Sequence, residues 1–154
     1  MALEIRNFEI SIMSFDPNKT TKLLFTCLDW RLHPAIVDYF AKEDIACDMC
    51  ITAGSLKGLL DPATQDFFLK QIETSKNLHH CQEVILTMHM DCGAYGGSAA
   101  FDGVEEEIAC YKNELKRAKQ TIGAKFSDLT ITTWMINLKN QEGKWQINPQ
   151  TVNL

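Results

Sequence analysis

Apolar residues occur along this chain in two patterns, short continuous runs and longer stretches with helical spacing. The runs predict buried strands at residues 22–28, 45–52, 82–89 and 129–138. Stretches with apolar residues three and four positions apart predict helices that begin at His33-Pro34, at Asp61-Pro62 and at Phe101. Because predicted strands and helices take turns, the sequence predicts an α/β protein with a mostly parallel sheet.

The helix that begins near Phe101 has the clearest periodicity in the chain. One face of it would carry Phe101, Val104, Ile108, Tyr111, Leu115, Ala118 and Ile122. Gly123 is predicted to end this helix. Asp61 is predicted to cap the preceding helix, which would run to about Asn77.

We expect three α-β-α layers around a central sheet of four to five strands. The first and third strands would lie side by side at the centre, which gives the strand order 2-1-3-4, and residues 145–147 would form an edge strand. The whole chain, residues 1–154, is predicted to be a single domain, with residues 1–18 as an arm that packs on it or on a second subunit. In such sheets, binding sites lie at the carboxyl ends of the strands.

Side chains that bind metals follow two of the predicted central strands. Cys27 ends the first strand, and His89 and Cys92 end and follow the third. Neighbouring strands lie about 4.8 Å apart, so these three residues could meet at one zinc ion. A fourth position would remain for water or for the carboxylate of Asp29, and Arg31 follows two residues later.

The residue types of this cluster also predict how it would behave. Two thiolates and a neutral imidazole sum with Zn²⁺ to roughly zero charge, so bound water would be less acidic than the pKa of about 7 reached with three histidines. Arg31 would keep Asp29 ionised and oriented. Any activity that depends on zinc-bound hydroxide is therefore predicted to rise with pH through and above neutrality.

Cys47 and Cys50 form a C-x-x-C motif, a pattern typical of redox or zinc sites. The motif lies inside a predicted strand, where residues three apart face opposite sides of the sheet. No second C-x-x-C motif exists in the chain. Packing against the core is the favoured interpretation, and a thiol redox protein stays open as an alternative.

The composition argues against a nucleic-acid-binding, membrane or secreted protein. The chain of 154 residues is 45% hydrophobic and 23% charged, with a net charge of −5 and no basic stripe, so no nucleic-acid partner is expected. No apolar run approaches the roughly 20 residues that span a membrane, and no membrane association is expected. Residues 1–7 lack the apolar core of a signal peptide, which predicts a cytoplasmic protein. In the cytoplasm, six cysteines favour metal binding or catalysis over disulfides.

The two strand-end clusters resemble those of the β-class carbonic anhydrases. That family has C-x-D-x-R after its first central strand and H-x-x-C after its third, which here are residues 27–31 and 89–92. Residues 51–54 stand where many members have R-N-A-G. The resemblance covers roughly residues 20 to 140.

The resemblance implies a zinc enzyme that interconverts carbon dioxide and bicarbonate. Cys27, His89 and Cys92 would bind the zinc. Asp29, oriented by Arg31, would accept a hydrogen bond from zinc-bound hydroxide or occupy the fourth zinc position itself. The family typically forms dimers or multiples of dimers, so a homodimer or dimer-based oligomer is expected.

The same resemblance implies that Ala53, Gly54 and Gly93 contact the substrate. Three departures concern the substrate pocket: Ile51-Thr52 replaces the usual Arg-Asn pair, Trp30 replaces a small residue, and Met88 replaces a glycine. A non-catalytic zinc protein of the same fold, or a hydrolase for another small linear molecule, therefore stays open as an alternative.

Overall fold

The computed structural model describes residues 21–154, and the predicted arm at residues 1–18 lies outside them. Within this range one sheet contains β1 (Lys22–Cys27), β2 (Cys47–Thr52), β3 (Glu83–His89), β4 (Thr130–Gln141) and β5 (Lys144–Thr151). The α-helices are α1 (His33–Lys42), α2 (Lys57–Leu60), α3 (Gln65–His79) and α4 (Val104–Lys125). Two short 3-10 turns, η1 (Gly93–Tyr95) and η2 (Ser98–Ala100), connect β3 to α4.

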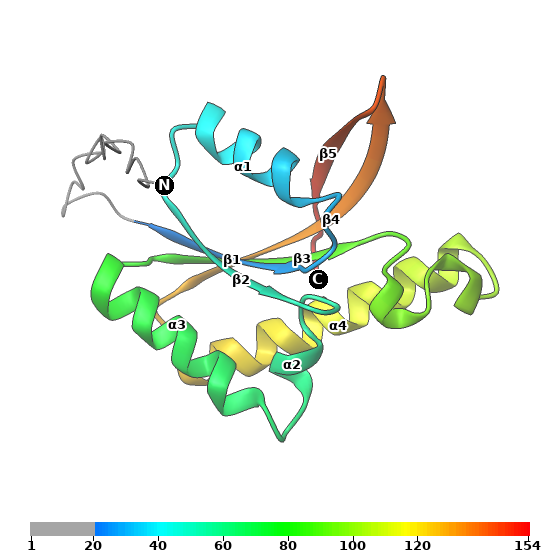
Figure 1. The fold of residues 1–154 in the computed structure, drawn as a ribbon. Coiled ribbons are helices and arrows are strands. Elements are labelled where there is room, and N and C mark those ends of the chain that lie inside the picture. The colour runs from blue at the N-terminus through cyan, green and yellow to red at the C-terminus, as the bar shows by residue number, and fades with distance from the viewer. Residues whose placement is uncertain (1–20) are drawn as a thin grey trace, which may run out of the picture.

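The strand order is β2-β1-β3-β4-β5, which confirms the predicted order of the first four strands and the predicted edge strand. The first four strands run parallel, and β5 pairs antiparallel with β4. Helix α1 covers one face of the sheet, and α2, α3 and α4 cover the other (Figure 1). This is the predicted three-layer arrangement, and it brings the carboxyl ends of β1 and β3 side by side.

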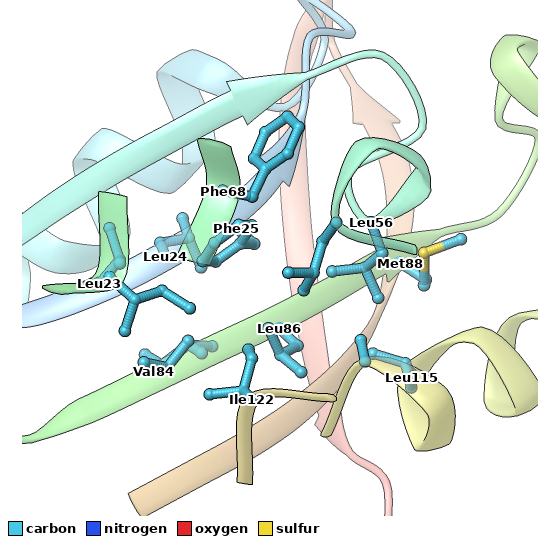
Figure 2. Packing of buried hydrophobic residues seen from close by; sticks show 14 of the residues in the cluster. Leu23, Leu24, Phe25, Leu56, Phe68, Val84, Leu86, Met88, Leu115 and Ile122 are labelled. Carbon is cyan, nitrogen blue, oxygen red and sulfur yellow. The ribbon is translucent and has the colours of Figure 1, made fainter. Parts of the chain in front are cut away.

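The two central strands owe their position to their uninterrupted apolar sequence. Every residue of β1 after Lys22 and of β3 after Glu83 is buried, as expected for strands covered on both faces. On the face covered by α2, α3 and α4, Phe25 packs against Phe68 with ring centroids 6.3 Å apart (Figure 2). Each large side chain buried in this way contributes about 1.5–3 kcal/mol to folding. The core therefore holds the strand ends that carry the site.

The helix predicted to begin at Asp61 begins at Gln65 instead, and a separate short helix lies before Asp61. The short helix α2 ends where Asp61 follows it, and α3 begins four residues later, after Thr64. The Asp61 carboxylate accepts a hydrogen bond from the backbone N–H of Ala63, so it closes the turn between the helices. The sequence pattern missed α2 because one helical turn is too short to show a period.

The boundaries of α4 also differ from the prediction. The helix starts at Val104, after Phe101, and continues past Gly123 to Lys125. A glycine inside a helix costs only about 1 kcal/mol, which the buried side chains of Ile122 and Phe126 on either side offset.

The apolar face of α4 is largely used inside the chain itself. From Tyr111 onward its apolar residues are fully buried in the core, and they offer no surface to a second subunit. The homodimer remains a prediction, and of this helix face only the start, where Val104 is 52% exposed, stays open to a second subunit. Among the described residues, no helix is both long enough and apolar enough to cross a membrane.

A candidate metal centre at the carboxyl end of the sheet

Cys27, His89 and Cys92 meet at the carboxyl ends of β1 and β3. Their ligand atoms all lie within 4.8 Å of one another. All three side chains are buried, with at most 4% of their surface exposed. Because the strands are adjacent and parallel, the fold brings together residues that are 65 positions apart in the sequence.

The hydrogen bonds of His89 leave one ring nitrogen available for a metal ion. Nδ1 lies 2.9 Å from the backbone carbonyl oxygen of Met90, which can only accept, so Nδ1 carries the hydrogen. Nε2 then presents a lone pair, and within residues 21–154 this buried atom has no hydrogen-bond partner. A buried acceptor without a partner costs free energy, and a metal ion would satisfy it. The donor set of one imidazole and two sulfurs fits zinc.

The two cysteine sulfurs lie 3.8 Å apart. The Cys92 thiol donates to the Cys27 sulfur and lowers the pKa of Cys27 well below its ordinary value. The backbone N–H groups of Asp29 and Gly54 stabilise the same thiolate. The pKa of Cys92 is raised because the Cys27 thiolate lies beside it and because the side chain is buried. The fold thus supplies a thiolate, which is the form of cysteine that binds metals.

Asp29 and Arg31 form a tight ion pair beside this cluster. The guanidinium Nη2 lies 2.5 Å from Oδ2, and Nε lies 3.0 Å from both carboxylate oxygens. The backbone N–H of Arg31 also donates to Oδ1 at 3.0 Å. These contacts hold the pKa of Asp29 below its ordinary value, since they favour the ionised carboxylate. Arg31 thus fixes the position of the Asp29 carboxylate, and the residues that could hold a metal ion are Cys27, His89 and Cys92.

Two further residues hold Arg31 in place. The backbone oxygen of Asp91 accepts from Nη2 at 3.4 Å, and the Asp91 carboxylate lies 3.5 Å from Nη1. The guanidinium also lies over the ring of Trp145 in β5, 5.6 Å from its centroid. The sequence alone indicated no site role for either residue. No local pattern connects Trp145 to the site, because only the pairing of β5 with β4 places it there.

A pocket of about 520 Å³ opens in front of Cys27 and Asp29. The residues that line it are Cys27, Leu28, Asp29, Trp30, Arg31, Ala53, Gly93 and Ala94. Ala53 and Gly93, predicted as substrate contacts, are thus at the pocket. Gly54 does not line it. Its backbone N–H points instead to the Cys27 sulfur, in a left-handed conformation with φ of 69°.

His33, the first residue of α1, is half-buried, and its Nε2 lies 3.1 Å from the carbonyl oxygen of Cys27. Since a carbonyl only accepts, Nε2–H donates to it. This contact ties the start of α1 to the end of β1, at the residue that carries the first candidate ligand.

The C-x-x-C segment lies inside β2, as predicted. Cys47 and Cys50 are half-buried and pack against the core, and among the described residues neither belongs to a metal-ligand cluster. Burial raises the pKa of Cys47 to about 12 and that of Cys50 to about 11. These two cysteines are therefore protonated thiols, which is consistent with a packing role.

Comparisons with known proteins agree with this geometry. A family model described as "Putative carbonic anhydrase" matches residues 17–149. Sequence relatives include an uncharacterized protein of Rickettsia conorii, 27% identical over 131 residues that cover 79% of this chain and 69% of the relative. Another, from Rickettsia bellii, is 26% identical over 129 residues that cover 79% of each chain. The crystal structure of β-carbonic anhydrase isoform I from Trichomonas vaginalis matches with a TM-score of 0.53 and 15% identity, over 87% of this chain and 86% of that one.

Proposed function

The chain belongs to the carbonic anhydrase family whose model it matches, and from this premise we propose that it is a zinc enzyme of the β class. The reaction would be the reversible hydration of carbon dioxide to bicarbonate. The observation that carries the proposal is the buried cluster of Cys27, His89 and Cys92 beside the Asp29–Arg31 pair.

These three residues would hold the zinc ion through two sulfurs and Nε2 of His89. Zinc bound there would supply a Lewis acid that makes water a nucleophile near neutral pH. Because both oxygens of Asp29 are engaged by Arg31, the fourth zinc position would be open to water. This favours a catalytic zinc site over a closed structural one.

The chain's own residues would orient the reactants. Asp29 would accept a hydrogen bond from the attacking water and so direct its lone pair toward the carbon atom of the substrate. Arg31 would keep this carboxylate ionised and in place, and Asp91 and Trp145 would hold Arg31. Such positioning lowers the barrier because the reacting groups are arranged before the reaction.

The pocket supports a small, uncharged substrate. The side chains of Leu28, Trp30, Ala53 and Ala94 give its lining a mainly apolar character, which suits carbon dioxide. Met88 is 1% exposed and belongs to the core, and Ile51 does not line this pocket. Two of the three departures from the family pattern therefore lie away from the pocket, while Trp30 lines it.

The decisive experiment combines zinc analysis with stopped-flow measurement of carbon dioxide hydration. We expect about one zinc ion per chain and a rate that rises with pH through and above neutrality, because the ligand set leaves bound water less acidic than three histidines do. Zinc without hydration would identify the non-catalytic zinc protein instead. A hydration rate that is independent of pH would contradict the low acidity predicted for water at this ligand set.

We also propose that the chain forms a homodimer. The support is the assembly typical of the family. Sedimentation at micromolar concentration would test the assembly, and a monomer alone would contradict it.

A further inference from the structure

Glu107 is an unusual residue because its carboxylate is buried. It lies in the first turn of α4, next to Glu105 and Glu106, which are both exposed. Only 1% of Glu107 is exposed, and among the described residues no basic side chain forms an ion pair with it. A buried carboxylate without a cation costs several kcal/mol unless hydrogen bonds compensate. Its contacts should therefore explain why it is there.

Both oxygens of Glu107 accept a short hydrogen bond. Oε1 accepts from the backbone N–H of Asp91 at 2.7 Å, and Oε2 accepts from the hydroxyl of Ser98 at 2.7 Å. The backbone N–H of Ser98 in turn donates to Oδ1 of Asp91 at 3.1 Å. The three residues form a closed ring of hydrogen bonds that joins α4 to the segment after β3.

Asp91 lies between the candidate ligands His89 and Cys92. Its backbone is in the left-handed conformation with φ of 59°, which a non-glycine residue keeps only where its surroundings enforce it. Glu107 accepts the hydrogen bond from the amide of Asp91, while the carbonyl and carboxylate of Asp91 contact Arg31. Glu107 therefore restrains the turn at Asp91. This turn sets the spacing between His89 and Cys92 and places Asp91 against Arg31.

We propose that Glu107 is a positioning residue for the metal centre, which fixes the turn between His89 and Cys92 through the amide of Asp91. The proposal rests on the proposed zinc function. It assigns Glu107 no contact with metal or substrate. Outer partners of this kind typically change metal affinity by 10–100-fold when removed.

The test compares zinc affinity in three variants of the full chain, measured by competition with a chromogenic chelator. Glu107→Met keeps the volume and the helix propensity but removes both acceptors. Glu107→Gln can still accept from Asp91 through its oxygen and donate to Ser98 through its amide. Glu106→Met is the matched control, since Glu106 is one residue away and accepts the backbone N–H of Asp102 at 2.5 Å, in a loop without ligands.

We expect Glu107→Met to bind zinc about 10-fold or more weakly, with Glu107→Gln and Glu106→Met within about 3-fold of the parent. The visible absorption of the cobalt-substituted chain should shift in Glu107→Met alone, because the ligand geometry changes. If Glu107→Met does not fold, Glu107→Asp replaces it, since its shorter side chain cannot reach Asp91. Unchanged affinity in the folded variant, or equal weakening in Glu106→Met, would overturn this inference alone. A parent chain that binds no zinc would overturn the proposed function as well.

Discussion

The chain contains two pairs of cysteines near the sheet, and the two pairs differ in chemistry. Cys27 and Cys92 meet at the carboxyl ends of adjacent strands, where hydrogen bonds lower the pKa of Cys27. Cys47 and Cys50 lie within the edge strand β2, where burial raises the pKa of both thiols. The close sequence spacing of the second pair suggests a site, yet it is the first pair, 65 residues apart, that belongs to the candidate metal site.

The difference shows that the position of a cysteine along a strand affects the pKa of its thiol. At a strand end, the backbone turns away and its N–H groups are free to point at a sulfur, as those of Asp29 and Gly54 do. In β2, burial is the largest influence on the pKa of both thiols, and within residues 21–154 no hydrogen bond opposes it at Cys50. Burial then disfavours the thiolate, because a charge loses its water.

The largest expected effect separates the two pairs by zinc content. Cys92→Ser should reduce zinc from about one ion per chain to a small fraction, because zinc sites depend on each of their protein ligands. Cys50→Ser is the matched control and should keep its zinc. Mass spectrometry of the purified proteins for zinc makes the measurement. Full zinc retention in both Cys27→Ser and Cys92→Ser would disprove the assignment.

The next effect concerns the ion pair at the strand end. Arg31→Ala should lower the rate of carbon dioxide hydration by on the order of 100-fold, because Asp29 loses the group that orients it. Zinc should remain bound, since Arg31 is not among the candidate ligands. Arg117→Ala is the control, because Arg117 pairs with Glu114 on α4. The role given to Arg31 fails if the stopped-flow rate of Arg31→Ala matches the parent.

A third experiment asks whether the thiols in the strand interior are reactive. The alkylation rate of Cys50 by iodoacetamide should rise roughly tenfold per pH unit above neutrality, because only the thiolate reacts. No plateau is expected before its pKa of about 11. Peptide mass spectrometry follows the rate at each cysteine. A plateau near neutral pH would mean an activated thiol and would revive the redox alternative.

The smallest effect is on stability. Asp29→Asn should lower the free energy of unfolding of the metal-free chain by about 1 kcal/mol or less at neutral pH. The folded pKa of Asp29 is lowered, so the ion pair stabilises the chain above the ordinary pKa of 3.8, and this contribution is lost as pH falls through the lower value. Urea unfolding of parent and variant at neutral and acid pH measures the difference. A difference that stays constant into acid would contradict the ion pair as its source.

The sequence by itself was enough to predict the order of strands and helices, the parallel sheet and the three candidate metal ligands. Apolar runs and helical spacing are local properties, and β1 and β3 carry them without interruption. The ligands could be predicted because they follow strands, and parallel strands end at the same edge of a sheet. Cys27, His89 and Cys92 were therefore found without any knowledge of their contacts.

Only the tertiary structure decided what surrounds those ligands. Trp145 reaches Arg31 because β5 returns along β4, and Glu107 reaches Asp91 because α4 packs beside β3. The N–H of Gly54 reaches the Cys27 sulfur because β2 lies next to β1. These contacts depend on how whole elements pack, whereas hydrophobic periodicity records only which face of an element is buried. The candidate metal ligands thus follow from local sequence, and the residues that support them follow from the packing of distant elements against one another.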